Sequence, residues 1–176
     1  MIIMNSIVLK LKDLLFPNME KKFLKRYEKV RSHIGKIGLY HKTMYYISFY
    51  RYEKLSRKLL VRIPLNVVGD GLSLPHPEVI GINPATKIGK NCRIQRMVGI
   101  GPSFGTNNCP TIGDNVYIGP GARLYGDIEI ADNCWIGANA VVNKSFLEPY
   151  SVIAGVPAKV VKIETRNWMD VFGNGK

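Results

Sequence analysis

The chain has 176 residues and a formal net charge of +12 at pH 7. A hydrophobic fraction of 46% is that of an ordinary globular protein, which excludes wholesale disorder and suits one domain with a modest appendage. No apolar run reaches the roughly 20 residues of a membrane-spanning helix, and residues 1–10 lack the basic start of a secretory signal. Three widely spaced cysteines predict neither a disulfide framework nor a metal site, so we expect a cytoplasmic setting and no bound metal.

The positive charge is concentrated at the start of the chain. Residues 1–64 contain 15 Lys and Arg against 4 Asp and Glu, a net charge of +11, whereas the remainder carries +1. The same segment holds only two of the 17 glycines. We therefore divide the chain into a basic helical region at 1–62, a domain at 63–163 and a C-terminal tail at 164–176.

The basic region predicts three helices. A short one spans about 7–15, Asn18 caps a second that runs from 19 to about 33, and a third runs from about 40 to 60. The third carries apolar and aromatic residues at spacings of three and four, which are Tyr45, Phe49, Tyr52, Leu55 and Leu59. This stripe predicts packing on the domain or on a partner subunit. The alternative is peripheral contact of residues 1–60 with the inner face of a membrane. Nucleic acid is not an expected partner, because no binding motif accompanies the charge.

The glycine-rich domain repeats with a period of six. Ten of the eleven slots are Ile, Leu or Val, and the series is Ile82, Ile88, Ile94, Ile100, Thr106, Ile112, Ile118, Leu124, Ile130, Ile136 and Val142. A second set of small or branched residues follows four positions later and includes Cys92 and Cys134. Neither a helix nor a simple strand keeps this register, but short strands separated by turns do. The repeat predicts a parallel β-helix with a column of equivalent side chains inside.

Two interruptions of the repeat are informative. The polar stretch around Thr106, from Gly101 to Cys109, predicts a loop that leaves the prism. The upstream slots, which end at Ile80, stand two residues out of phase with Ile82, and this register break follows the sequence 74–77, Leu-Pro-His-Pro. Such a break can re-aim a side chain toward a site, and His76 lies off the inward slots.

The repeat resembles that of the hexapeptide-repeat acyltransferases. The resemblance covers about 63–163 and is closest to the serine acetyltransferases and the related sugar O-acetyltransferases of surface-polysaccharide pathways. It depends on the Leu-Pro-His-Pro segment, on Cys-Pro-Thr-Ile at 109–112 and on Ala-Gly-Val-Pro-Ala-Lys at 154–159. It implies a left-handed β-helix, a homotrimer with sites between subunits, and acetyl-CoA as acyl donor.

The resemblance also implies roles for individual residues. His76 matches the catalytic histidine that deprotonates the acceptor hydroxyl. Ala138 matches a position whose backbone contacts the pantetheine arm, its equivalent one coil earlier is Pro120, and Lys159 suits the phosphates of coenzyme A. Cys109 stands where the serine enzymes have a second histidine.

Two acidic residues of the serine enzymes are also absent here. Pro75 replaces one, and the segment 61–64 contains no acid where the other is expected. These departures predict an acceptor without an amino-acid head group, such as a sugar or glycan precursor.

Acyl transfer from a thioester to an alcohol needs a base, an oxyanion donor and alignment of two substrates. We expect His76 to be the base, with Glu78 as one candidate to orient it. Gly101 and Ser103 are candidate donors to the thioester oxygen. Cys109 and Asn83 are expected to line the site, and a nucleophilic Cys109 is the less favoured alternative.

The sequence thus predicts an acetyl-CoA-dependent sugar O-acetyltransferase. Serine O-acetyltransferase is the alternative reading, and a non-catalytic trimeric scaffold is the second. The tail, with Trp168 and Phe172, is expected to cap the last coil or to lie on the groove between subunits.

Overall fold

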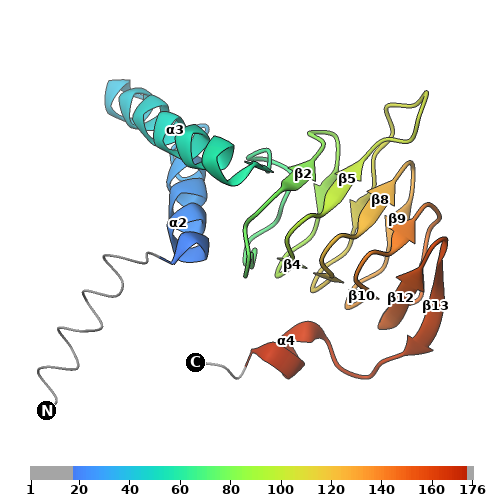
Figure 1. Cartoon of the computed structure of the whole chain (residues 1–176). Helices are drawn as coiled ribbons and strands as arrows, with labels where there is room; N and C mark the ends of the chain where they lie inside the picture. The colour runs from blue at the N-terminus through green and yellow to red at the C-terminus, as the bar shows by residue number, and fades with distance from the viewer. Residues whose placement is uncertain (1–17, 174–176) are drawn as a thin grey trace, which may run out of the picture. The chain divides into compact units, whose positions relative to one another are not determined.

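The computed structural model describes residues 18–173, so the helix expected at 7–15 lies outside the described part of the chain. The chain divides into two compact units, Met1–Tyr52 and Glu53–Lys176 (Figure 1). The boundary lies inside the helix α3 (Leu39–Leu59), about ten residues before the boundary at 62/63 that the composition suggests. No helix within residues 18–173 is long and apolar enough to cross a membrane.

The helical unit contains α2 (Met19–Arg31) and the first part of α3 (Leu39–Leu59). The predicted cap is confirmed, because the Asn18 side chain accepts a hydrogen bond of 3.0 Å from the Lys21 amide. Phe23 and Tyr27 of α2 are fully buried, and the ring of Tyr52 lies 5.4 Å and 5.9 Å from theirs. The aromatic stripe of α3 therefore packs on α2 at Tyr52.

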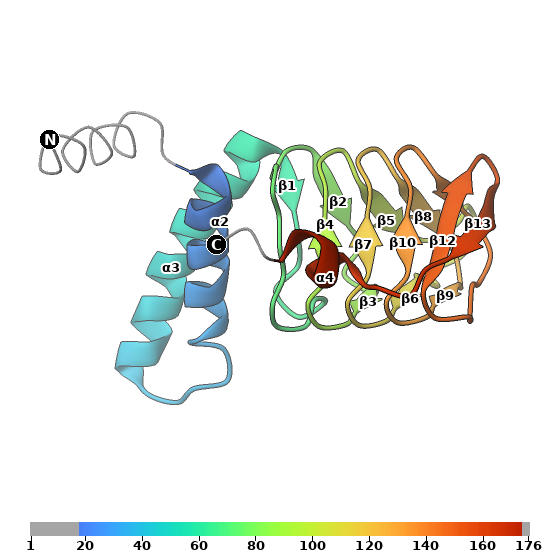
Figure 2. The same cartoon turned by 90° about the horizontal axis from the view of Figure 1, so that it is seen from below.

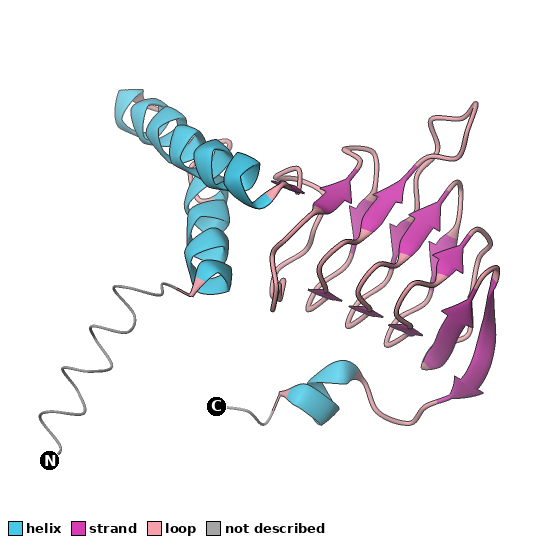
Figure 3. Cartoon of the chain, in the orientation of Figure 1, coloured by secondary structure: helices cyan, strands magenta, loops and turns pink. Residues whose placement is uncertain are grey.

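The second unit is a prism of three sheets, and the chain passes from sheet A to sheet B to sheet C in each coil (Figure 2). Sheet A contains β1 (Val61–Arg62), β2 (Ile80–Ile82), β5 (Gly99–Gly101), β8 (Arg123–Tyr125) and β11 (Val141–Val142). Sheet B contains β3 (Lys87–Ile88), β6 (Thr111–Ile112) and β9 (Glu129–Ile130). Sheet C contains β4 (Arg93–Ile94), β7 (Tyr117–Ile118), β10 (Trp135–Ile136), β12 (Ser151–Gly155) and β13 (Ala158–Ile163). All strand pairs are parallel except β12 with β13 (Figure 3).

The predicted inward columns form the core of this prism. Every aliphatic slot of the repeat is buried, as are Cys92 and Cys134, which are core residues as expected. Burial raises the pKa of the Cys92 thiol to about 12 and also raises the pKa of the Cys134 thiol, so both remain protonated and inert. Thr106, the one polar slot, is exposed in the loop between β5 and β6.

A ladder of asparagines stabilises the turns from sheet B to sheet C. Asn91, Asn115 and Asn133 have φ angles of +53°, +57° and +60°, which asparagine tolerates better than most residues. The Asn91 side-chain amide donates to Asn115 over 3.2 Å, and the Asn115 amide donates to Asn133 over 3.0 Å. Each turn is thereby tied to the next.

The C-terminal segment forms a short helix, α4 (Trp168–Phe172), that lies on the outer face of sheet C (Figure 2). The Trp168 indole donates to the Asn91 carbonyl over 2.8 Å, and the Arg93 guanidinium lies over the rings of Trp168 and Phe172 at 5.2 Å and 5.4 Å. The prediction that this tail caps the last coil is therefore wrong, because cation–π and aromatic contacts hold it against sheet C. Its position on the groove between subunits, the alternative, stays a prediction.

Candidate functional site

His76 lies on an enlarged turn between sheet C and sheet A. The register break predicted after residues 74–77 lies in β2, where Ile80 and Ile82 both point inward and are buried. His76 itself is exposed, and its carbonyl accepts a hydrogen bond of 2.8 Å from the Glu78 amide. Val79 closes the turn with a φ of +52°, an uncommon conformation for a β-branched residue and one often found beside functional sites.

The turns from sheet C to sheet A stack into a column that starts at this turn. The Met97 amide donates to the Glu78 carbonyl over 2.9 Å, Gly121 donates to Arg96 over 3.0 Å, and Asn139 donates to Pro120 over 2.9 Å. His76, Arg96, Pro120 and Ala138 therefore lie on turns along one edge of the prism, which we call the C–A edge.

Arg96 is an exposed residue of this column that our sequence reasoning missed. It follows Ile94 by two positions, as Pro120 follows Ile118 and Ala138 follows Ile136, so the period could have identified it.

Asn83, Gly101, Ser103 and Cys109 lie at the opposite edge of sheet A, on the turns and the loop that lead to sheet B. The Asn83 carboxamide oxygen accepts from the Ala85 amide over 2.9 Å, and the Ser103 carbonyl accepts from the Thr106 amide over 3.2 Å. The Cys109 thiol is partly exposed and donates a long hydrogen bond of 3.7 Å to the Asn107 carbonyl. Sheet A separates these residues from His76 within one chain.

A groove of about 540 Å³ crosses the outer face of sheet A and joins the two edges. It is lined by Arg62, Val79, Gly81, Ile82, Asn83, Pro84, Val98, Gly99, Ile100, Gly101, Pro102, Arg123 and Tyr125. Gly81 leaves its floor open, because a Cβ atom added there would meet no atom within 4 Å. Two arginines and no acidic residue line the groove within the described chain. Arg62, Arg123 and Tyr125 were not anticipated, since outward positions carry no repeat signal.

Arg123 is held in place by backbone carbonyls. Its guanidinium donates to the carbonyl of Met97, and it lies 3.3 Å from the Ala122 carbonyl and 3.5 Å from that of Gly121. The side chain therefore spans from β8 to the C–A edge without using a carboxylate. Its positive charge remains uncompensated by any acidic residue that lines the groove.

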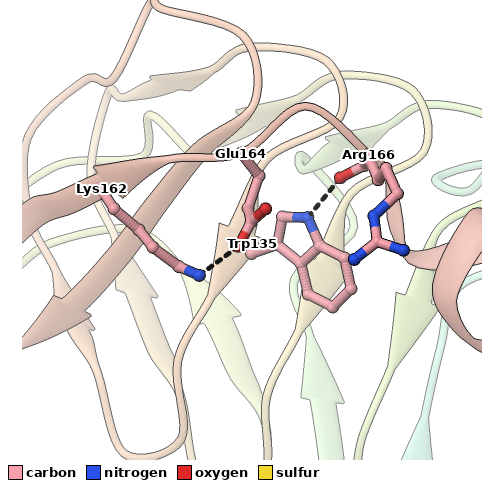
Figure 4. Close-up of polar contacts among 4 residues, drawn as sticks. All are labelled: Trp135, Lys162, Glu164 and Arg166. Atoms are coloured by element: carbon pink, nitrogen blue, oxygen red, sulfur yellow. Dashed lines mark hydrogen bonds and ion pairs between the residues drawn. The ribbon is translucent and has the colours of Figure 1, made fainter.

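Lys159 lies at the other end of the prism, on β13, far along the coil axis from His76. With Lys144, Phe146, Ser151 and neighbouring residues it lines a shallow hollow of about 500 Å³. The adjoining C-terminal segment is tied to the last coils by the Trp135 indole, which donates to the Arg166 carbonyl over 3.1 Å (Figure 4). Lys162 pairs with Glu164, and this hydrogen bond lowers the pKa of the Glu164 carboxyl. Residues 18–173 contain no cluster of three or more His, Cys, Asp or Glu residues able to hold a metal ion.

Parts of the sequence are similar to known proteins. Residues 109–144 match the family described as bacterial transferase hexapeptide (six repeats). A serine acetyltransferase of Buchnera aphidicola is 34% identical over 128 residues, which cover 70% of this chain and 49% of that protein. One of Mycobacterium tuberculosis is 37% identical over 100 residues, which cover 56% and 43% respectively. The chain is similar to the hexapeptide-repeat acyltransferases. It spans about half the length of the curated relatives that it matches.

Solved structures give the same result for the fold. Serine acetyltransferase from Vibrio cholerae superposes with a TM-score of 0.70 at 23% identity, over 94% of this chain and 62% of that one. The enzyme of Neisseria gonorrhoeae in complex with serine gives a TM-score of 0.64 at 28% identity, over 84% and 58%. A serine acetyltransferase in complex with CoA gives 0.64 at 26% identity, over 85% and 60%. The fold is therefore the parallel β-helix that the repeat predicted, with the left-handed coil that the resemblance implied.

Proposed function

We propose that this protein is an acetyl-CoA-dependent O-acetyltransferase and that His76 is its general base. The position of His76 carries the proposal: it is exposed on the enlarged turn at the C–A edge, in the column of Pro120 and Ala138. The other two histidines of the chain, His33 and His41, lie in the helical unit with their Nδ1 atoms 3.2 Å apart.

The reaction requires few groups. The imidazole of His76 takes the proton of the acceptor hydroxyl as its oxygen attacks the thioester carbonyl. The Ser103 backbone amide stabilises the oxyanion of the tetrahedral intermediate, because Pro102 has no N–H and Gly101 pairs with Tyr125 in the β5–β8 ladder. The intermediate collapses with departure of the coenzyme A thiolate, which takes the proton back from the imidazolium. Cys109 lines the site and forms no acyl intermediate.

Coenzyme A fits along the C–A edge in this proposal. The Ala138 amide binds the pantetheine arm, and Pro120, one coil earlier, has no N–H to offer. Lys159, together with Lys144, attracts the phosphates at the far end of the prism. The solved serine acetyltransferase that contains CoA supports coenzyme A as the ligand, and no residue for a metal is required.

We further propose that the protein works as a cytoplasmic homotrimer. His76 and Cys109 lie on opposite edges of sheet A in one chain. In a closed ring of three prisms, the C–A edge of one protomer can face the β5–β6 loop of its neighbour. Such an arrangement would bring the two residues into one site and cover the groove of sheet A.

L-serine is the acceptor that the comparisons favour, since the curated relatives named above are serine acetyltransferases. A sugar or glycan hydroxyl, our first prediction, is the second candidate, and no comparison supports it directly. One observation favours it: Arg62 and Arg123 line the groove without an acidic residue from the described chain. The groove offers no carboxylate to the ammonium of serine, although its two cations would attract the serine carboxylate, and both cations suit an anionic sugar.

Release of coenzyme A, measured with Ellman's reagent, separates these possibilities. Purified protein is incubated with acetyl-CoA and, in turn, L-serine, simple sugars and nucleotide sugars. Turnover with serine supports the acceptor of the relatives, whereas turnover with a sugar alone supports the second candidate. No thiol release with any acceptor would contradict the proposed acyl transfer and would favour a non-catalytic scaffold.

A further inference from the structure

Exposed apolar side chains are concentrated on the helical hairpin formed by α2, residues 32–38 and the first half of α3. The large hydrophobic residues that are exposed there are Ile34, Ile37, Leu39, Tyr40, Tyr46, Ile47 and Tyr50. Ile37 and Leu39 at the turn are 95% and 81% exposed. Tyr46 and Tyr50 lie on one face of α3, four residues apart. Several large apolar side chains exposed on one short hairpin indicate an interaction site.

Cations surround these residues. A groove of about 640 Å³ between α2 and α3 is lined by Lys22, Lys25, Arg26, Glu28, Lys29, Met44, Ile47, Ser48 and Arg51. Its one acidic residue, Glu28, is already paired with Arg31 at 3.0 Å. Met44 and Ile47 give the groove an apolar wall. Lys36 and Lys42 lie on or beside the turn, so cations flank the apolar residues from both helices.

Three kinds of partner could cover such a surface. A second copy of the hairpin would bring its own lysines against these, and like charges disfavour that contact. A nucleic acid would match the charge but would leave the aliphatic side chains of Ile37 and Leu39 without a partner. An anionic lipid surface offers both complements, because phosphates meet the lysines while the interfacial layer takes the aliphatic and tyrosine side chains.

We propose that this hairpin binds the surface of an anionic phospholipid bilayer. The turn segment 34–40 enters the interfacial layer, and Lys22, Lys25 and Lys29 contact lipid phosphates. The contact is peripheral, since no helix within residues 18–173 is able to span the bilayer. The hairpin contains none of the residues proposed for acyl transfer, so the two proposals can fail separately.

Co-sedimentation of the full-length protein with vesicles tests the proposal. One set of vesicles is phosphatidylcholine alone, and the other contains 30% phosphatidylglycerol. We expect binding to the anionic vesicles, weak binding to the neutral ones, and a loss of binding as salt is raised. Equal binding to both sets, or none to either, would overturn the proposal.

Two variants locate the contact. K25Q/K29Q removes two groove charges and is expected to lower the vesicle partition coefficient roughly 30-fold. I37S/L39S keeps every charge, and a loss of roughly tenfold or more is expected because the inserted apolar area is removed. The matched control K87Q/K90Q removes two exposed lysines of the β-helix and should bind as the wild type does.

Each other outcome counts against the proposal. An equal loss in the control would show that net charge alone drives binding. Unchanged binding in both hairpin variants would place the contact elsewhere. If I37S/L39S instead dissociates an oligomer in the absence of lipid, the occupant of this surface is a second copy. Circular dichroism verifies that the helices of each variant remain folded.

Discussion

Replacement of Gly81 by phenylalanine tests whether the groove of sheet A holds the acceptor. A Cβ atom at Gly81 meets nothing within 4 Å, and its φ lies outside the left-handed region, so the fold accepts a side chain there. Glycine weakens a strand interior, so Gly81→Phe is expected to leave the unfolding free energy unchanged or to raise it by about 0.5 kcal/mol. An aromatic side chain at this position would project into the groove and occupy space that the acceptor needs.

We therefore expect Gly81→Phe to exclude the acceptor and so to lower kcat/KM for the acceptor at least tenfold. Thiol release is the assay, thermal unfolding verifies the fold, and size-exclusion chromatography verifies that Gly81→Phe keeps the oligomeric state of the wild type. Thr111→Phe places the same ring on an exposed position of sheet B and is the matched control. Full activity in Gly81→Phe, or an equal loss in Thr111→Phe, would refute the assignment of this groove.

Three other predictions follow from single contacts. Asn115→Ala removes two ladder hydrogen bonds and places alanine at a φ of +57°, so we expect a loss of roughly 1–3 kcal/mol in urea unfolding, and a loss below 0.5 kcal/mol would contradict the role of the ladder. Burial and the charges of Lys29 and His41 lower the pKa of His33 below 6.5. As the pH falls, His33 of the unfolded chain takes up a proton before His33 of the folded chain does, which favours unfolding. The melting temperature should therefore fall as pH drops below about 6.5, and it should fall more in the wild type than in His33→Gln. An equal fall of the melting temperature with pH in the wild type and in His33→Gln would contradict the role of His33. Iodoacetamide should label Cys109 alone in the native protein, and Cys109→Ser should keep activity within roughly tenfold. Loss of all turnover would instead indicate a nucleophile.

The period of six was sufficient to predict much of the β-helix. It fixed which side chains face inward, because each coil repeats the same short strands and turns, and it located the β5–β6 loop as a polar interruption. The cap at Asn18 was also readable, since capping depends on residues close in sequence.

Other features could not be read from a repeat. Both Ile80 and Ile82 are buried because the register break falls inside β2, and the repeat alone does not predict where in the strand it falls. The contact of Trp168 with Asn91 joins residues 77 positions apart. Arg62 and Arg123 point outward, where the repeat places no constraint, and only the stacking of coils brings them to one groove.

The most direct test of the account is the turnover of His76→Ala with acetyl-CoA and the best acceptor found. The exposed position of His76 predicts no loss of fold, and thermal unfolding verifies this. Removal of a general base is expected to lower kcat by roughly 10²–10⁴-fold and to leave the binding of coenzyme A unchanged. Turnover within a few-fold of wild type would contradict the assignment of His76 as the base.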